Sequence, residues 1–332
     1  MVEFRHSHAA HCESGAVSAI LRYGGFDISE AMCFGISSAL IFGYFPFIKI
    51  NDQPLITYRM PPRYILKGAA KNLGAKFEIK TFKNDRKGAV KALDEELEKG
   101  GIAGVQTSIF YLPYFPKDMR FHFNAHNLVI FKKENGVYFV SDPVFDHVNT
   151  VSEEDLTRAR FAKGALAPNG AFYKLVSAPQ NVNFEKAIKQ SVSKTVRMML
   201  QTPLPIIGIW GMRTLAKKIA SLKTATEKDR HFAKMFITQL IRMQEEIGTG
   251  GGGFRFMYAS FLQESSKILN SSILSESSDI MSEAGDKLRL FALKGAKIIK
   301  NQDELNPKYL SNLFMQCASL EEGVYKKLRG LK

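Results

Sequence analysis

The sequence has few cysteines and lacks the spacings by which cysteines bind metals. Only Cys12, Cys33 and Cys317 occur among 332 residues, so they cannot all pair with one another in disulfides. Their separations contain no Cys-x-x-Cys pattern, which is the usual cysteine spacing of a structural zinc site. A disulfide-stabilised secreted fold and a zinc finger are therefore disfavoured, and we expect a reduced thiol at Cys12 in a cytoplasmic protein.

The sequence also lacks long uninterrupted apolar segments. Residues 1–11 are polar and rich in histidine, so we expect no signal peptide. The longest apolar run, 34–48, is too short and too broken to cross a membrane, and it predicts a buried helix that runs into a strand. The residues that interrupt this run are Ser37, Ser38, Gly43 and Pro46.

The composition is that of a globular protein with an excess of positive charge. Hydrophobic residues make up 45% of the chain, charged residues make up 23%, and the net charge is +14. Simple solubility accounts for such a charge, but it also suits an acidic partner such as nucleic acid, an anionic membrane surface or an acidic carrier protein. No helix-turn-helix, zinc-finger or aromatic RNA-binding motif is present, which disfavours nucleic acid.

Two kinds of sequence pattern meet near residues 177–181, a short polar stretch that contains Pro179. Helical and strand patterns alternate before it, whereas nearly everything from Phe184 onward has helical periodicity. We therefore predict an α+β domain over residues 1–178 and an all-α helical bundle over residues 183–332.

Periodicity, capping residues and turn residues predict the individual elements. Helices are expected at 16–23, 63–73 and 86–98, and at the capping pairs Asp27–Glu30 and Ser152–Asp155. Strands are expected at 48–50 and 55–58 around a turn at 51–54, and at 75–82, 102–106, 121–131, 137–142 and 171–176, with an Asn-Gly turn at 135–136. Helices of the second domain are expected at 183–201, 209–222, 225–247, 254–269, 274–299 and 304–329.

Cys12 lies where an apolar helical pattern begins, in the segment His11-Cys12-Glu13-Ser14-Gly15. A thiol in the first turn of a helix faces unpaired backbone N–H groups and the positive end of the helix dipole. Both favour the nucleophilic thiolate. Free cysteines are also commonly buried as small apolar residues. Cys12 considered without its predicted partners could therefore be a structural core residue.

A histidine and an aspartate on two predicted strands complete a possible nucleophile, base and orienter. His126 begins an apolar strand and Asp142 ends another, directly before Pro143. His122 lies four residues earlier and shares a face with His126 on an unbroken strand, so spacing alone does not choose between them. We prefer His126 because an apolar run follows it. Each residue has a structural alternative, since buried histidines and turn aspartates are common.

The residues around Cys12 carry further hypotheses. His6, His8 and His11 suggest a metal, but no second acidic or cysteine cluster stands at ligand spacing, so we expect no metal site. His11 or Glu13 is instead expected to line a substrate pocket, and the backbone N–H of Cys12 to stabilise an oxyanion. Cys33 and Cys317 lie in apolar helical patterns and are expected in the core.

A glycine tract at 248–253 precedes Phe254-Arg255. It has no Gly-Lys-Ser/Thr ending and follows no strand, so a P-loop is improbable and a flexible connection between helices is the simple interpretation. A helix start after several glycines can still bind a phosphate or carboxylate of a substrate. On that basis Gly251, Gly252 and Arg255 are predicted to contact substrate.

Taken together, the ordered motifs resemble the butirosin biosynthesis protein H N-terminal family, followed by the helical domain of unknown function (DUF4872 type) that accompanies it. The resemblance covers essentially the whole chain. Its motifs are His11-Cys12-Glu13-Ser14, Leu21-Arg22-Tyr23-Gly24-Gly25, Ser29-Glu30-Ala31, Phe34-Gly35-Ile36, Tyr111-Leu112-Pro113-Tyr114, Ala125-His126, Ser141-Asp142-Pro143, Gly248-Thr249-Gly250-Gly251-Gly252, Phe254-Arg255 and Phe261-Leu262.

The resemblance implies a papain-like, peptidase-C39-like cysteine domain that acts as an acyltransferase. An acyl or aminoacyl group would pass from the thioester of an acidic acyl carrier protein to a small-molecule amine in secondary-metabolite biosynthesis. Cys12 would hold the acyl group as a thioester, His126 would act as base and then acid, and Asp142 would orient it. No cofactor is implied beyond the phosphopantetheine arm that carries the donor. The segment Phe34-Gly35-Ile36-Ser37-Ser38 has fewer glycines than the family pattern.

Two other functions remain open from the sequence. The same three residues would serve a cysteine hydrolase, either an amidase or a peptidase, in which water replaces the amine. A non-catalytic binding module that retains these residues is the third possibility.

Overall fold

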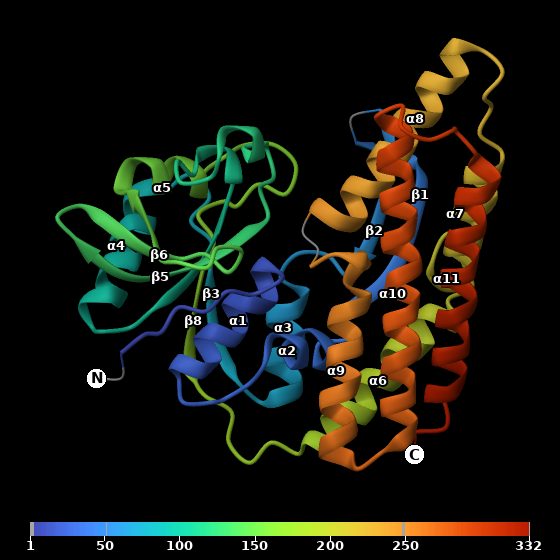
Figure 1. Ribbon diagram of the computed structural model, residues 1–332. Helices are drawn as coiled ribbons and strands as arrows, with labels where there is room; N and C mark the ends of the chain where they lie inside the picture. The colour runs from blue at the N-terminus through green and yellow to red at the C-terminus, as the bar shows by residue number, and fades with distance from the viewer. Residues whose placement is uncertain (1–2, 51, 248–249, 332) are drawn as a thin grey trace. The chain divides into compact units, whose positions relative to one another are not determined.

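An antiparallel sheet of six strands forms the centre of the first of two units into which the chain folds (Figure 1). The computed structural model describes residues 3–50, 52–247 and 250–331. The first unit consists of Met1–Cys33 and Pro62–Val182, and the second consists of Phe34–Pro61 and Asn183–Lys332.

The sheet brings the start of one strand beside the end of the next. Its strand order is β3 (Lys76–Lys80), β8 (Phe172–Ser177), β4 (Ala103–Thr107), β5 (His126–Glu134), β6 (Val137–Ser141) and β7 (Asn149–Ser152), and all neighbours are antiparallel. Strands β5 (His126–Glu134) and β6 (Val137–Ser141) are joined at Asn135 and Gly136, whose φ angles of 50° and 77° are those of a tight hairpin turn. The predicted Asn-Gly turn is confirmed. The turn sets Glu134 opposite Val137, and a register shift between Ile130 and Lys132 then brings Val129 opposite Ser141.

Helices cover both faces of this sheet (Figure 1). On one face, Leu93 of α4 (Arg86–Glu98) and Leu156 of α5 (Glu153–Arg160) share an apolar core with Leu128 and Ile130 of β5. On the other face, α1 (Cys12–Tyr23) packs against β4, β5 and β8. The alternation of side chains along β5 supplies apolar residues to both faces.

The second unit is a bundle of helices that also contains a β-hairpin. Its longest helices, α10 (Ser272–Ile299) and α11 (Pro307–Leu328), pack against each other, and α9 (Arg255–Leu269) packs against α10. The hairpin consists of β1 (Leu40–Ile50) and β2 (Gln53–Arg59), which are antiparallel. The predicted α+β fold followed by a helical region is confirmed, but the second unit is not all-α.

The single domain boundary predicted at 178–183 therefore separates the two units only in part. Residues 34–61 precede the sheet in the chain, yet they belong to the second unit. Their aromatic side chains explain this placement, because Phe34 stacks on Phe254 at 4.9 Å and Phe42 packs edge-on against Phe314 at 5.9 Å. Long-range burial of this kind has no signature in the local sequence pattern.

The remaining elements complete both units. Those of the first unit are α3 (Tyr64–Leu73), β3 (Lys76–Lys80), β4 (Ala103–Thr107), β7 (Asn149–Ser152) and β8 (Phe172–Ser177), with short 3-10 turns at η1 (Ile109–Tyr111) and η2 (Lys117–Met119). Helix α2 (Glu30–Ile36) spans the boundary between the units. Those of the second unit are α6 (Phe184–Gln201), α7 (Gly208–Ala220), α8 (Glu227–Ile241), the π-helical turn η3 (Arg242–Glu246) and the 3-10 turn η4 (Gly252–Phe254).

Three differences from the predicted elements stand out. Strand β1 begins at Leu40, so the predicted helix-to-strand run contains more strand than expected. Strand β7 was not predicted, and the helix expected at 225–247 becomes π-helical after Ile241. Asn51 of the predicted 51–54 turn, and Gly248 and Thr249 of the glycine tract, lie outside the described residues.

None of the helices described in the structure has the length and apolar character that a membrane-spanning helix requires.

Candidate active site

Cys12 is the first residue of helix α1, and only 3% of it is exposed. The preceding residue, His11, has the extended conformation of an N-cap, and its side chain accepts a hydrogen bond from the backbone N–H of Ser14. The predicted position of Cys12 at a helix start is confirmed. Cys12 therefore lies beside the first backbone N–H groups of α1, at the positive end of its dipole.

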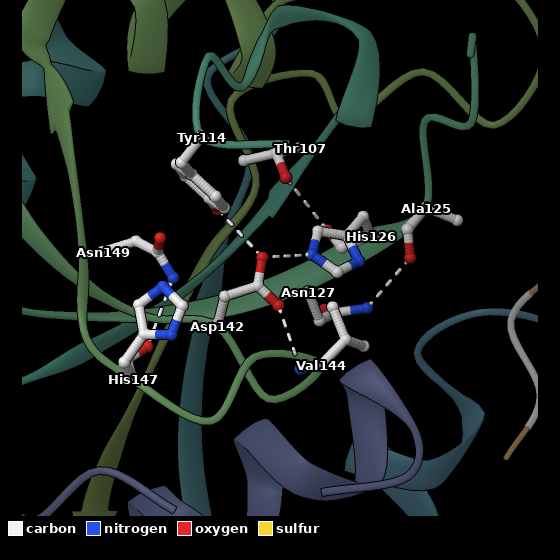
Figure 2. A network of polar contacts seen from close by, with 9 residues as sticks. All are labelled: Thr107, Tyr114, Ala125, His126, Asn127, Asp142, Val144, His147 and Asn149. Atoms are coloured by element: carbon white, nitrogen blue, oxygen red, sulfur yellow. Dashed lines mark hydrogen bonds and ion pairs between the residues drawn. The ribbon is translucent and has the colours of Figure 1, made fainter. Parts of the chain in front are cut away.

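His126 and Asp142 meet at one edge of the sheet. His126 begins β5 and Asp142 directly follows β6, so the antiparallel hairpin brings them together. The Nε2 atom of His126 lies 2.7 Å from Oδ2 of Asp142 (Figure 2), and both residues are buried. The Cys12 thiol lies close enough to His126 to contribute to its raised pKa. Because Nε2 faces Asp142, Nδ1 is the ring nitrogen left for the thiol.

The surroundings of His126 favour its protonated form. Burial opposes the charge, but the Asp142 carboxylate, through its charge and its hydrogen bond, and the interaction with Cys12 outweigh burial and raise the pKa of His126 from 6.5 to about 10. An imidazolium beside a thiol at a helix start is the arrangement that stabilises a thiolate–imidazolium pair.

Asp142 is held by two further donors. The Tyr114 hydroxyl donates to Oδ2 at 2.9 Å, and the Val144 backbone N–H donates to Oδ1 at 3.2 Å (Figure 2). Burial, reinforced by the Asp142 charge, raises the pKa of Tyr114 well above its ordinary value. The hydroxyl therefore keeps its proton and remains a donor to the carboxylate, which accepts from three groups at once.

Aromatic rings line this pair. The ring of Phe115 packs edge-on against the His126 ring, with centroids 5.5 Å apart, and Phe145 packs against Phe115 at 4.9 Å. Apolar rings beside a hydrogen-bonded charge pair exclude water and strengthen the electrostatic interaction.

The segment before Cys12 is tied to the loop that carries Asp142. His6 contacts the Ser141 hydroxyl at 2.7 Å and the Phe145 carbonyl at 3.1 Å, and the Ala9 N–H donates to the Pro143 carbonyl at 2.6 Å. A Cβ atom on Gly15 would lie only 2.7 Å from the Pro143 Cβ atom. Glycine at position 15 thus allows the loop and the helix start to approach closely.

The structure distinguishes His126 from His122. His122 is exposed and stacks on Phe110, with ring centroids 4.1 Å apart, whereas His126 meets Asp142. Among the described residues, no three His, Cys, Asp or Glu side chains are arranged to hold a metal ion. This includes His6, His8 and His11.

His11 and Glu13, predicted to line a substrate pocket, are buried and hold helix ends. His11 caps α1. One carboxylate oxygen of Glu13 accepts from the backbone N–H groups of Ile65 and Leu66, at 2.9 and 3.2 Å, at the start of α3. These contacts satisfy orphan helix N–H groups and give both side chains a structural role.

Gly251, Gly252 and Arg255, predicted to contact substrate, lie in the interior of the second unit instead. Arg255 has no exposed surface and donates to both carboxylate oxygens of Glu321, at 2.8 and 3.0 Å. The Gly252 N–H donates to Glu245, and a Cβ atom on Gly253 would lie 2.4 Å from the Tyr58 ring. Gly253 therefore packs against the hairpin strand β2, and the burial of Gly251, Gly252 and Arg255 corrects their assignment as substrate contacts.

The other two cysteines are fully buried, as predicted. Cys33 lies in α2, and the Cys317 thiol donates to the Glu321 carboxylate at 3.3 Å.

Sequence reasoning assigned no site role to Tyr114 or Glu30. Tyr114 ends the motif Tyr111-Leu112-Pro113-Tyr114. Its hydroxyl meets the Asp142 carboxylate only in the folded chain, so the sequence pattern did not indicate this contact. Glu30 was predicted to pair with Asp27 at the start of a helix. Its carboxylate instead accepts from the backbone before Cys12.

A buried cysteine at a helix start, beside a histidine that an aspartate orients from an antiparallel sheet, defines a papain-like cysteine enzyme domain. The model described as "Domain of unknown function (DUF4872)" matches residues 154–328, more than half of the chain, so the chain belongs to that family. The model "Butirosin biosynthesis protein H, N-terminal" matches residues 11–143. The predicted family is thus confirmed.

Other comparisons are distant. A crystal structure of a C39-like peptidase from Bacillus anthracis is similar with 14% identity and a TM-score of 0.36, over 54% of this chain and 96% of that chain. No curated protein matches this chain.

Proposed function

We propose that this protein is an acyltransferase that moves an acyl or aminoacyl group from a carrier-protein thioester to an amine through an acyl-Cys12 intermediate. The observation that carries the proposal is the buried His126–Asp142 hydrogen bond beside Cys12, which begins a helix. The match of residues 11–143 to the butirosin biosynthesis protein H N-terminal model supports the thioester donor.

The first half of the reaction forms a thioester on the enzyme. The Cys12 thiolate attacks the donor thioester carbonyl, and the backbone N–H groups at the start of α1 stabilise the oxyanion. The carrier thiolate then leaves and takes the proton of His126. Acyl-Cys12 and a free carrier thiol remain, with His126 neutral.

The second half forms the amide. The acceptor amine attacks the acyl-Cys12 carbonyl while neutral His126 removes a proton from the nitrogen. The Cys12 thiolate leaves, and the product is an amide beside a restored thiolate–imidazolium pair. Water competes with the amine at this stage, so the apolar rings of Phe115 and Phe145 favour transfer over hydrolysis.

The partners follow from this chemistry. The donor is an acidic acyl carrier protein whose phosphopantetheine arm holds the acyl group, and the acceptor is a small-molecule amine of secondary metabolism. The net charge of +14 suits an acidic carrier. No metal, nucleic acid or membrane span enters the proposal.

The test is incubation of the protein with an acyl-phosphopantetheine or acyl-carrier donor, with and without an amine. We expect an acyl adduct by intact mass that is absent in Cys12→Ala, and an amide that forms only with the amine. Donor cleavage at a rate indifferent to amines would instead identify a cysteine hydrolase. The absence of any adduct from any donor would indicate a binding module.

A further inference from the structure

Glu30 holds the segment that leads into Cys12. Its Oε1 atom accepts from the His11 backbone N–H at 2.7 Å and from the Ser14 hydroxyl at 2.9 Å. Its Oε2 atom accepts from the Ala10 backbone N–H at 2.8 Å. One carboxylate thus fixes the two residues directly before the nucleophile and a side chain one half-turn after it.

This contact is not ordinary helix capping. Although Glu30 begins α2, the first turn of that helix is capped by the Ser29 hydroxyl, which accepts from the Met32 N–H at 2.9 Å. The Glu30 side chain bonds to the start of α1 instead. Its position sixteen residues beyond Ser14 in the chain makes it a tertiary contact.

The Ser14 hydroxyl extends the contact to the N-cap. Its Oγ atom lies 2.9 Å from Nδ1 of His11, and the same nitrogen accepts the Ser14 backbone N–H at 3.3 Å. Glu30, Ser14 and His11 therefore form one network around the first turn of α1. The backbone of Cys12 lies inside this network.

The carboxylate is retained in surroundings that oppose its charge. Burial raises the pKa of Glu30, while its hydrogen bonds to Ala10, Ser14 and His11 and the nearby His8 act in the opposite direction. A glutamine of the same shape has a single acceptor oxygen, so it cannot accept from both sides, and its amide N–H would face another donor.

We propose that Glu30 is a positioning residue for the nucleophile, which sets the orientation of the Cys12 thiol toward His126 through the backbone of Ala10 and His11. The assignment of Cys12 as nucleophile rests on the proposed function. The network accounts for the motif Ser29-Glu30-Ala31, to which the reaction itself assigns no role.

The test measures the Cys12 thiol directly and needs no substrate. The full chain is treated with iodoacetamide at a series of pH values, and alkylation of the Cys12 peptide is followed by mass spectrometry. For Glu30→Gln we expect the rate at neutral pH to fall by about tenfold, and the pH of half-maximal rate to shift. Ser14→Ala removes one of the three contacts, so we expect a smaller loss of about threefold.

Glu96→Gln is the matched control. Glu96 is also a partly buried carboxylate of the first unit, where it pairs with Lys174 at 2.5 Å. This variant should leave the rate and the pH profile of Cys12 unchanged.

The outcomes separate the two proposals. Wild-type rate and profile in folded Glu30→Gln overturn the positioning role while Cys12 remains a reactive thiol. If Glu30→Gln does not fold, Ser14→Ala carries the test, and a wild-type rate in that variant overturns the role. If wild-type Cys12 reacts no faster than a free cysteine, the proposed function fails, whatever Glu30 does.

Discussion

At the scale of single residues, the site depends on Asp142. Its carboxylate accepts from Tyr114, His126 and Val144, which lie on three different segments of the first unit. Each donor restricts the carboxylate, and the carboxylate in turn sets which His126 nitrogen remains for Cys12. Loss of one donor should therefore weaken catalysis without removing the nucleophile.

For Tyr114→Phe we expect kcat/KM for acyl transfer to fall by about 10- to 100-fold. The ring stays, but a hydrogen bond to a charged group is lost, which amounts to about 1.5–3 kcal/mol. Steady-state kinetics measures the change, and circular dichroism checks the fold. Tyr111→Phe is the control, since Tyr111 lies on the same loop and its ring packs against His122 and Arg158. Equal activity of both variants would contradict the role of the Tyr114 hydroxyl.

The pH dependence should report the His126–Asp142 pair. Since the pKa of His126 is raised from 6.5 to about 10, the pair stabilises the fold fully below about pH 6.5 and loses this contribution as the pH rises through about 10. We expect the thiolate–imidazolium pair of Cys12 and His126 to persist up to an alkaline limit near pH 10. The pH dependence of the Cys12 alkylation rate measures this limit. Asp142→Asn removes a cause that raises this pKa, so its alkaline limit should move to lower pH. An unchanged limit would contradict the pairing.

At the scale of elements, the start of α9 is fixed by a buried ion pair. Arg255 donates to Glu321 of α11, which also accepts from Tyr325 at 3.0 Å. The Arg255 guanidinium lies over the Tyr58 ring at 5.3 Å. These contacts join helices α9 and α11 to strand β2 inside the second unit.

For Glu321→Gln we expect the free energy of unfolding of the second unit to fall by about 3–5 kcal/mol, because a buried guanidinium loses its counter-charge. Urea denaturation measures the change. The neighbouring variant Glu322→Gln is the control, since it breaks only partly exposed pairs, with Arg213 and Lys326, and should cost about 1 kcal/mol or less. Similar losses of unfolding free energy in both variants would contradict the stabilising role of the Arg255–Glu321 pair at the start of α9.

At the scale of the whole molecule, the chain crosses between its units more than once. Residues 34–61 leave the first unit, pack with the second, and return before the sheet begins. Phe34, Phe42 and Tyr58 are buried there, and each large apolar side chain contributes about 1.5–3 kcal/mol when buried. The first unit is therefore not the same as the N-terminal half of the chain.

We expect a fragment of residues 1–182 to aggregate and to bind a hydrophobic dye, because these side chains lose their partners. Replacement of residues 34–61 by a short Gly-Ser linker should restore a soluble, monomeric first unit. Light scattering and dye fluorescence compare the two fragments. A fragment 1–182 that stays monomeric and dye-free would contradict the assignment of the hairpin to the second unit.

The sequence determined what depends on local pattern. The helix start at Cys12 follows from apolar periodicity, and the Asn135-Gly136 turn sets the pairing at its end of the hairpin. The short separation of the two strands brings His126 near Asp142, but the register shift between Ile130 and Lys132 was not predictable from the turn. Local backbone preferences and side-chain alternation act over a few residues, so a single sequence contains them.

Only the tertiary structure decided which distant residues meet. Arg255 looked like an anion-binding residue after glycines, but Glu321 lies 66 positions away and neutralises it in the interior. Glu30 looked like a cap for its own helix, but it bonds to the start of α1. The unit that holds residues 34–61 was likewise set by ring contacts with the far end of the chain. Burial and charge pairing are determined by the final packing, in which separation along the chain has no part.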